Sequence, residues 1–178
     1  MHPCDLICRS GLQNHPHSIA DRKQAMKLAE ALLLRAGQKK KLSSLRSRMT
    51  SNVLIDAEDE PTEDPTTLLV EYSMVLDEKQ ALMLKINHTN LNSRLPDGRT
   101  MAAALNERDT LIQRHAILDA LCMAAKKDRL RSTRNEVKYK SSIDVPSHQK
   151  QMDNLAEKIR KLNNTIQENN WKIDLMEE

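Results

Sequence analysis

Apolar residues recur every three to four positions along four stretches of the chain, and turn signals separate these stretches. Such spacing places the apolar side chains on one face of an α-helix. The pattern predicts helices over residues 23–55, 65–92, 101–130 and 146–176. Asp64 and Thr100 stand where they can cap the second and third helices, and Pro65 suits a first helical turn. The sequence therefore predicts an all-α fold, an antiparallel bundle or coiled coil of about four long helices.

Two details of the first two predicted helices concern their packing. Residues 35–41 are polar and contain one Gly, so they are either a solvated stretch or a weak point of the first helix. In the second helix, Leu69, Leu76 and Met83 lie beside the main apolar stripe and widen it. A wide apolar face is typical of a helix that packs against two neighbours rather than one.

The last predicted helix carries the strongest pattern, a heptad seam in which apolar positions alternate spacings of three and four. A narrow seam of this kind is typical of a coiled coil, and a single Asn within it can fix the register. A lone Trp beside a seam is typical of an interface anchor. We therefore expect a homo-oligomer whose interface is formed by Leu155, Ile159, Leu162, Ile166, Asn169, Trp171 and Ile173.

Residues 136–145 change the period from helical to alternating. Val137, Tyr139, Ile143 and Val145 stand between polar residues, and a period of two predicts a short strand or a hairpin about Ser141. Because a strand needs a partner for its N–H and C=O groups, we expect pairing with its own other half or with a second subunit.

Composition and charge narrow the class of protein. Ala, Leu, Lys, Arg and Glu make up 79 of the 178 residues, with three Gly and no Phe, which argues against an all-β fold. Lys and Arg number 28 against 25 Asp and Glu, so no nucleic-acid partner is expected. Three cysteines build no disulfide framework, and no apolar run reaches the roughly 18 residues of a membrane span. We expect a cytoplasmic protein.

Residues 1–25 differ from the rest of the chain. They hold two of the three Cys and three of the six His, and they show no helical or strand period. We interpret them as a disordered leader upstream of the true start at Met26, with residues 26–178 forming a single elongated helical domain. The alternative is a metal site built from Cys4, Cys8, His15 and His17, although their spacing is not a usual zinc pattern.

Two polar residues, Arg108 and His115, interrupt the inner stripe of the third helix and need partners there. The first interpretation is structural pairing, for example of His115 with Asp119 four residues on. The second is an inter-helix catalytic or divalent-metal site that adds nearby carboxylates or His88, since helical bundles hold metals between carboxylates and imidazoles. His88 also suits a simple role as a cation at a helix C-terminus. The candidate metal ligands are Glu107, Asp109 and His115.

Several blocks of the chain resemble a family of uncharacterised small bacterial proteins, many of which carry the label "septicolysin". These blocks are MKLAEALLLRA, EPTEDP, LPDGRTMAAALNERDTLIQRHAILDAL, NEVKYKSSIDV and IQENNWKIDLME, in this order over residues 26–178. The resemblance implies a helical, self-associating protein without an established activity, and a start at the MKLAEAL block. The label implies a membrane-active cytolysin. The sequence thus favours a non-catalytic oligomeric scaffold without cofactor, with a metal protein or enzyme and a cytolysin as alternatives.

Overall fold

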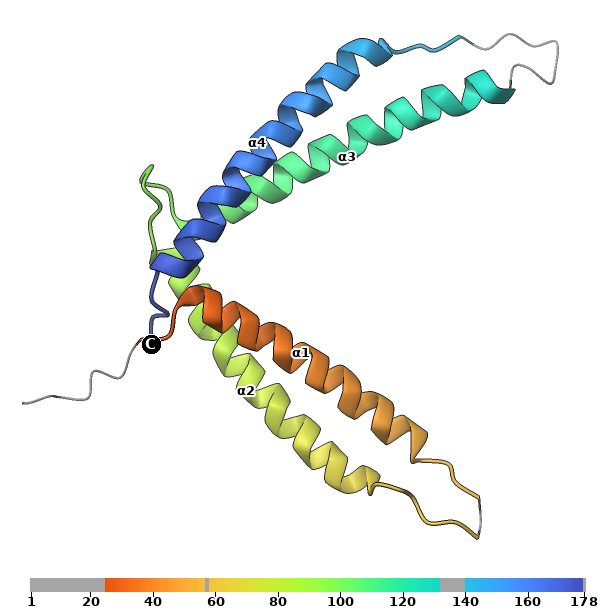
Figure 1. The fold of residues 1–178 in the computed structure, drawn as a ribbon, viewed down its shortest axis with the longest axis vertical. Helices are drawn as coiled ribbons and strands as arrows, with labels where there is room; N and C mark the ends of the chain where they lie inside the picture. Colours follow the sequence, from red (N-terminus) through yellow and green to blue (C-terminus); the bar gives the residue numbers. More distant parts are fainter. Residues whose placement is uncertain (1–24, 57, 132–139, 178) are drawn as a thin grey trace, which may run out of the picture.

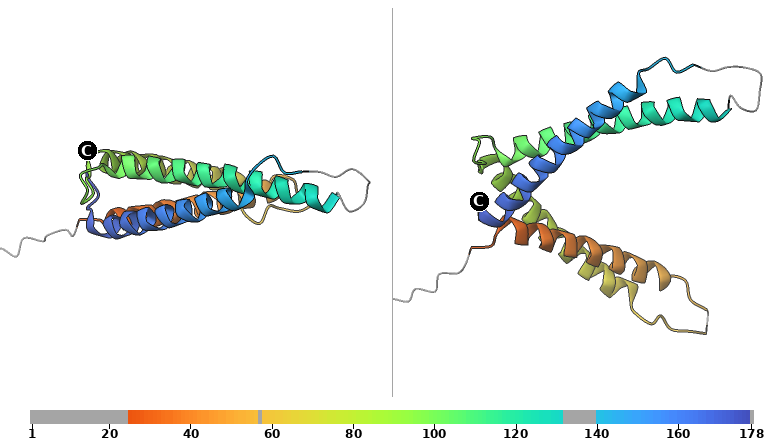
Figure 2. Two further views of the ribbon diagram at one scale, coloured as in Figure 1. Left: turned by 90° about the horizontal axis from the view of Figure 1, so that it is seen from above. Right: turned by 45° about the horizontal axis from the view of Figure 1, so that its top comes forward.

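The computed structural model describes residues 25–56, 58–131 and 140–177, and its helices form two hairpins that meet in a V (Figure 1). One arm pairs α1 with α2, and the other pairs α3 with α4. The predicted all-α fold of four helices is confirmed. Seen from above, α1 lies in one layer with α4 and α2 in the other layer with α3 (Figure 2). The helix bounds are α1 Leu28–Ser51, α2 Pro65–Asn92, α3 Met101–Arg131 and α4 Val145–Lys172.

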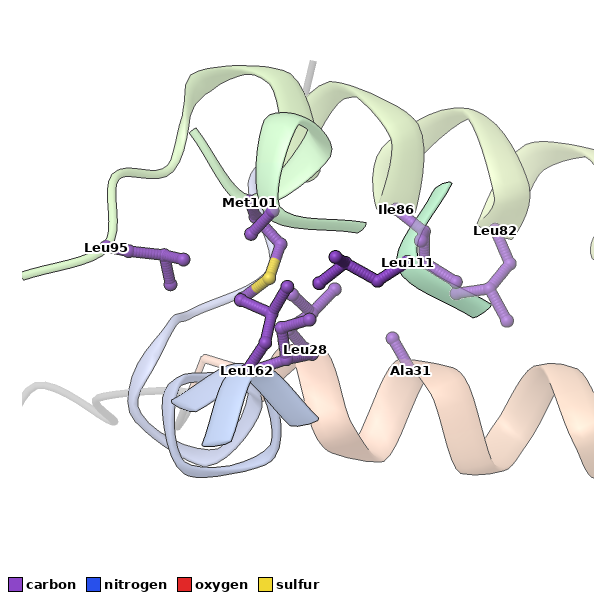
Figure 3. Close-up of a cluster of buried hydrophobic side chains, with 10 residues drawn as sticks. Leu28, Ala31, Leu82, Ile86, Leu95, Met101, Leu111 and Leu162 are labelled. Carbon is purple, nitrogen blue, oxygen red and sulfur yellow. The ribbon is translucent and has the colours of Figure 1, made fainter. Parts of the chain in front are cut away.

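The main apolar core lies at the vertex of the V, where all four helices contribute side chains. Figure 3 shows these side chains converging from both arms. A smaller cluster lies farther out between α1 and α2. The vertex core consists of Leu28, Ala31, Leu82, Ile86, Leu95, Met101, Ala104, Leu111, Leu162 and Ile166, and the second cluster of Leu42, Leu45, Leu68 and Val75. Because the core residues of the two arms are shared only at the vertex, the arms diverge beyond it.

Two short connections fix the vertex. Residues 93–100 link α2 to α3, and Gly98 adopts a φ of 85°, which a residue without Cβ tolerates well. On the other side, the start of α1 pairs with the segment after α4: Leu28 N–H donates to Ile173 O at 2.9 Å, and Leu175 N–H donates to Met26 O at 2.7 Å. Both arms are therefore tied together by backbone hydrogen bonds as well as by the core.

The predicted helix starts are confirmed for α2 and α3. The Asp64 carboxylate accepts hydrogen bonds from Thr66 N–H at 3.0 Å and Thr67 N–H at 3.1 Å, with Pro65 in the first turn. Thr100 Oγ1 accepts from Ala103 N–H at 3.2 Å. The helix α1 runs unbroken through the polar residues 35–41, and no described atom outside the local backbone of α1 lies within 4 Å of where a Cβ on Gly37 would be. This polar stretch is therefore solvated helix and not a break.

The alternating residues 136–145 give no strand in the part of them that the structure describes, 140–145, and that prediction is wrong there. Val145, predicted to end the strand, is instead the first residue of α4. The physical reason lies in its neighbours, because Asp144 accepts a hydrogen bond from Ser147 N–H at 3.4 Å and Pro146 occupies the first helical turn. Residues 136–139 lie outside the described residues, as does the predicted leader apart from Ala25.

Candidate functional site

Arg108 of the α3 stripe and the adjacent Glu107 find ionic partners close to themselves. Arg108 contacts the neighbouring Asp109, with Nη2 2.7 Å from Oδ1. Glu107 pairs with Arg99 from the loop before α3, and Arg99 also holds Asp97 at 2.6 Å. The Arg99 hydrogen bond keeps the pKa of Asp97 below its ordinary value. These contacts agree with the structural interpretation of the acidic and basic residues at the start of α3.

His115 is half-buried and lines a shallow groove between α3 and α4, together with Ile112, Ile159 and Arg160. The groove has a volume of about 430 Å³. Asp119 and His88 are exposed, and His88 lies on α2, one turn before its end. His115 thus shares the groove with apolar side chains, an arginine and two asparagines, and none of the described residues that line it is a carboxylate.

The three candidate metal ligands do not converge. Glu107, Asp109 and His115 are separated by two and six residues, and at about 100° per residue their side chains leave α3 in different directions. Within the described residues, no group of three or more His, Cys, Asp or Glu side chains could hold a metal ion. The metal site stays a prediction, which elemental analysis of the purified protein tests. Cys4, Cys8, His15 and His17 lie outside the described residues.

The apolar seam of α4 is used inside the chain. Leu162 and Ile166 are 7% and 2% exposed in the vertex core, and Leu155, Ile159 and Ile173 pack against that core. Asn169 is buried, and its Nδ2 donates to Thr165 O at 2.8 Å. Trp171, in contrast, is 56% exposed. Within the chain, α3 and the vertex core already cover most of this seam. Its role in contacts between subunits stays a prediction.

The described residues present another apolar surface that the sequence reasoning missed. We call it the outer stripe of α2. It is exposed in this chain, with Met74 at 60% and Leu91 at 63%. In the sequence, this stripe is a second set of apolar positions on the same helix, whose spacings are three, four or seven residues. It was overlooked because the stripe that packs on α1 runs along the same stretch of residues and shows the same kind of spacing. The outer stripe consists of Val70, Met74, Ala81, Leu84 and Leu91.

Charged residues lie along one border of the outer stripe. Glu71 pairs with Lys41 of α1 at 2.7 Å, and Lys85 lies 3.7 Å from Glu177 of the C-terminal segment. Glu78 stands midway between them on the same border. A groove of about 860 Å³ runs along this border between α1, α2 and the C-terminal segment, and Ala81 forms part of its wall. The other border carries the uncharged residues Ser73, Gln80 and Asn87.

The stripe of Leu69, Leu76 and Met83, which we call the side stripe, has no second neighbour along most of the arm. Leu69 is 54% exposed and Leu76 is 43% exposed. Residues of α3 join those of α2 only in the vertex core, whereas the outer cluster contains residues of α1 and α2 alone. The helix α2 thus has the two neighbours predicted for it, α1 and α3, only at the vertex. Beyond the vertex it packs against α1 alone.

No helix among the described residues combines the length and the apolarity that crossing a membrane requires. Comparison with known proteins gives a family and a fold. Residues 35–175 match the model of a family of unknown function, DUF6847, and the chain belongs to this family. No protein of curated function matches. The name septicolysin and the lytic activity that it implies stay predictions.

A solved structure agrees with the fold. The crystal structure of a functionally unknown conserved protein from Corynebacterium diphtheriae is 30% identical to this chain, with a TM-score of 0.81. The match covers 85% of this chain and 99% of that one. The similarity therefore extends over nearly the whole of the V-shaped fold and adds no activity.

Proposed function

We propose that this member of the DUF6847 family is a non-catalytic helical scaffold that works through self-association. The observation that supports the proposal is the exposed apolar surface of α2. Seven large apolar side chains of this helix are exposed, namely Leu69, Val70, Met74, Leu76, Met83, Leu84 and Leu91.

The thickness of the arm explains why this surface needs a partner. Each arm is only two helices thick, so a helix has one neighbour along the arm and leaves its other sides to solvent. Apolar area gains about 25 cal/mol per Å² when it leaves water. Exposed contiguous patches beyond a few hundred Å² usually mark interaction sites. Covering the outer face of α2 therefore favours association.

The arrangement of polar residues agrees with a scaffold rather than an enzyme. The charged groups at the start of α3 are bound to one another, as in the pairs of Arg99 with Asp97 and Glu107. The acidic residue Glu63 is held by Arg48, and this contact lowers the pKa of Glu63. These pairs join loops to helices, which is a structural task.

The test is the molar mass of the full chain in solution. We expect light scattering after size-exclusion chromatography to give at least twice the chain mass of 20.4 kDa at micromolar concentration. A mass of one chain across the whole accessible concentration range would contradict the proposal.

A further inference from the structure

We infer that the outer stripe of α2 pairs with the outer stripe of a second copy, antiparallel across a two-fold axis. Each α1/α2 arm would then form half of a four-helix bundle. This inference rests on the proposed self-association, and it specifies the surface, the partner and the orientation.

The spacing of the stripe is that of a coiled-coil seam. Asp77 and His88 fill the gaps between its apolar members, so that positions 70, 74, 77, 81, 84, 88 and 91 alternate spacings of four and three. Alternation of this kind keeps one seam facing a partner helix. All seven residues are exposed in the single chain, whereas Leu68, Val75 and Leu82 on the opposite side of the helix are buried. The helix α2 therefore carries two seams, of which the chain covers one.

Large apolar side chains meet on both sides of the axis when two copies run antiparallel. The register that centres the axis near residue 79 places Met74 opposite Leu84 of the second copy. It places the small Ala81 opposite Asp77, and Val70 opposite His88. Isologous pairing of this kind forms a closed dimer, because each contact occurs twice. The polar Asp77 and His88 then set the register, as single polar residues in a seam do.

Charge complementarity favours the same orientation. In the antiparallel register, Glu71 borders Lys85 of the second copy, and this opposite-charge pair occurs twice. At the axis, Glu78 lies beside Glu78 of the second copy. The interface therefore has two attractive Glu71–Lys85 pairs and one repulsive Glu78–Glu78 pair. The other border brings together only Ser73, Gln80 and Asn87. A parallel pairing would instead place Glu71 beside Thr66 and Lys85 beside Gln80, with no opposite-charge contact.

The other exposed faces of α2 and α4 carry weaker patterns. The side stripe has apolar residues only every seventh position, because Ser73 and Gln80 occupy the places where a seam needs its second column. The exposed face of α4 is polar apart from Trp171 and small residues. Of the exposed faces of α2 and α4, the outer stripe is thus the one that combines a seam spacing with complementary charges along its border.

The first experiment compares Leu84→Asp with Leu76→Asp in the full chain. Both leucines lie on α2 and are exposed, at 51% and 43%, but only Leu84 belongs to the outer stripe. We expect Leu84→Asp to give a molar mass of one chain with unchanged helical circular dichroism, and Leu76→Asp to remain a dimer. A monomeric wild-type chain would overturn the proposed function and this inference together. A dimeric Leu84→Asp would overturn this inference alone.

The second experiment tests the orientation by charge reversal. Glu71→Lys and Lys85→Glu should each raise the dissociation constant of the dimer several-fold at low salt. The double variant should restore wild-type affinity, because it rebuilds both pairs between copies. It does not rebuild the pairs with Lys41 and Glu177 within each chain, so restoration reports on the interface. A dimer that the single variants leave unchanged, or that the double variant weakens further, would overturn the antiparallel register.

Discussion

The second helices of the two arms, α2 and α4, have the same local construction and different surfaces. Each has 28 residues, and each begins after an Asp cap with Pro in its first turn. Among the described side chains of α4, Trp171 is the one large apolar group that is exposed, whereas α2 exposes seven. The other exposed side chains of α4 are polar or small, among them Asp153, Glu157 and Lys161.

This difference shows that two helices of the same length and capping can have their apolar faces covered to different extents within the chain. The seam of α4 is covered by α3 and by the vertex core, and its remaining surface suits water. The helix α2 is covered by α1 on one side and remains apolar on the other. The proposed partner of α2 outside its own chain would gain the same free energy, from removing apolar area from water, that holds α4 against α3 and the vertex core.

The largest expected effect compares a buried seam residue of α4 with a stripe residue of α2. Ile166→Ala should lower the free energy of unfolding by about 2–4 kcal/mol, because Ile166 is 2% exposed and its removal leaves a cavity. Leu84→Ala should lower it only at concentrations where the dimer forms, since association stabilises the folded state by mass action. Urea denaturation at two protein concentrations measures both. If both variants lost the same free energy of unfolding at both protein concentrations, the proposed difference between a covered face of α4 and an interface on α2 would be contradicted.

A matched pair of glycine substitutions separates the vertex from the α1/α2 arm. Gly98→Ala should lower the free energy of unfolding by about 1 kcal/mol, because its φ of 85° strains a residue with Cβ. Gly37→Ala should raise it by about 0.5–1 kcal/mol, because Gly37 lies inside α1 with open space around it. Thermal unfolding of both variants should show opposite shifts of the melting temperature. Shifts of the same sign would contradict the assigned backbone conformations.

Removing the N-terminal caps of α2 and α4 should change stability less than the substitutions above. Asp64 accepts hydrogen bonds from Thr66 N–H, Thr67 N–H and, at 2.6 Å, the Thr67 hydroxyl. The carboxylate of Asp144 accepts one described hydrogen bond, from Ser147 N–H at 3.4 Å. Asp64→Ala should therefore lower the melting temperature more than Asp144→Ala. A larger effect of Asp144→Ala would show that the caps are ranked wrongly.

The same cap gives a pH dependence with a definite sign. The Thr67 hydroxyl, followed by the backbone N–H groups of Thr66 and Thr67, lowers the pKa of Asp64 below its ordinary value of 3.8. Its stabilising effect is present above that value and is lost as the pH falls below it, because protonation then favours the unfolded chain. The melting temperatures of wild type and Asp64→Ala should therefore approach each other under acidic conditions. A gap that does not shrink as the pH falls well below 3.8 would exclude the charge of Asp64 as its cause.

The smallest expected effect is in the fluorescence of Trp171. This side chain lies on α4, outside the outer stripe, so its emission should be the same in the wild-type dimer and in Leu84→Asp. Its 56% exposure predicts emission typical of an indole in water. A blue shift on association would instead place Trp171 in the interface, as the heptad pattern of α4 predicts.

Local features of the fold could be predicted from the sequence, because they depend on neighbouring residues. The bounds of α2 and the caps at Asp64 and Thr100 follow from the spacing of apolar residues and from cap chemistry. The strand prediction failed at Val145 for a local reason as well, because Asp144 and Pro146 outweigh an alternating pattern. The candidate site was less predictable, since Arg108 has a neighbouring partner in Asp109 that no spacing on the inner stripe indicates.

The sequence by itself determined that four helices form and which residues of each helix are apolar, because propensity, capping and period act over a few residues. Only the tertiary structure decided what covers each apolar face. It assigned Leu162 and Ile166 of α4 to the vertex core of the same chain and left the outer stripe of α2 exposed. The physical reason is that a helical period marks a face as apolar without identifying its neighbour. That neighbour depends on the geometry at the vertex, where residues far apart in the chain meet.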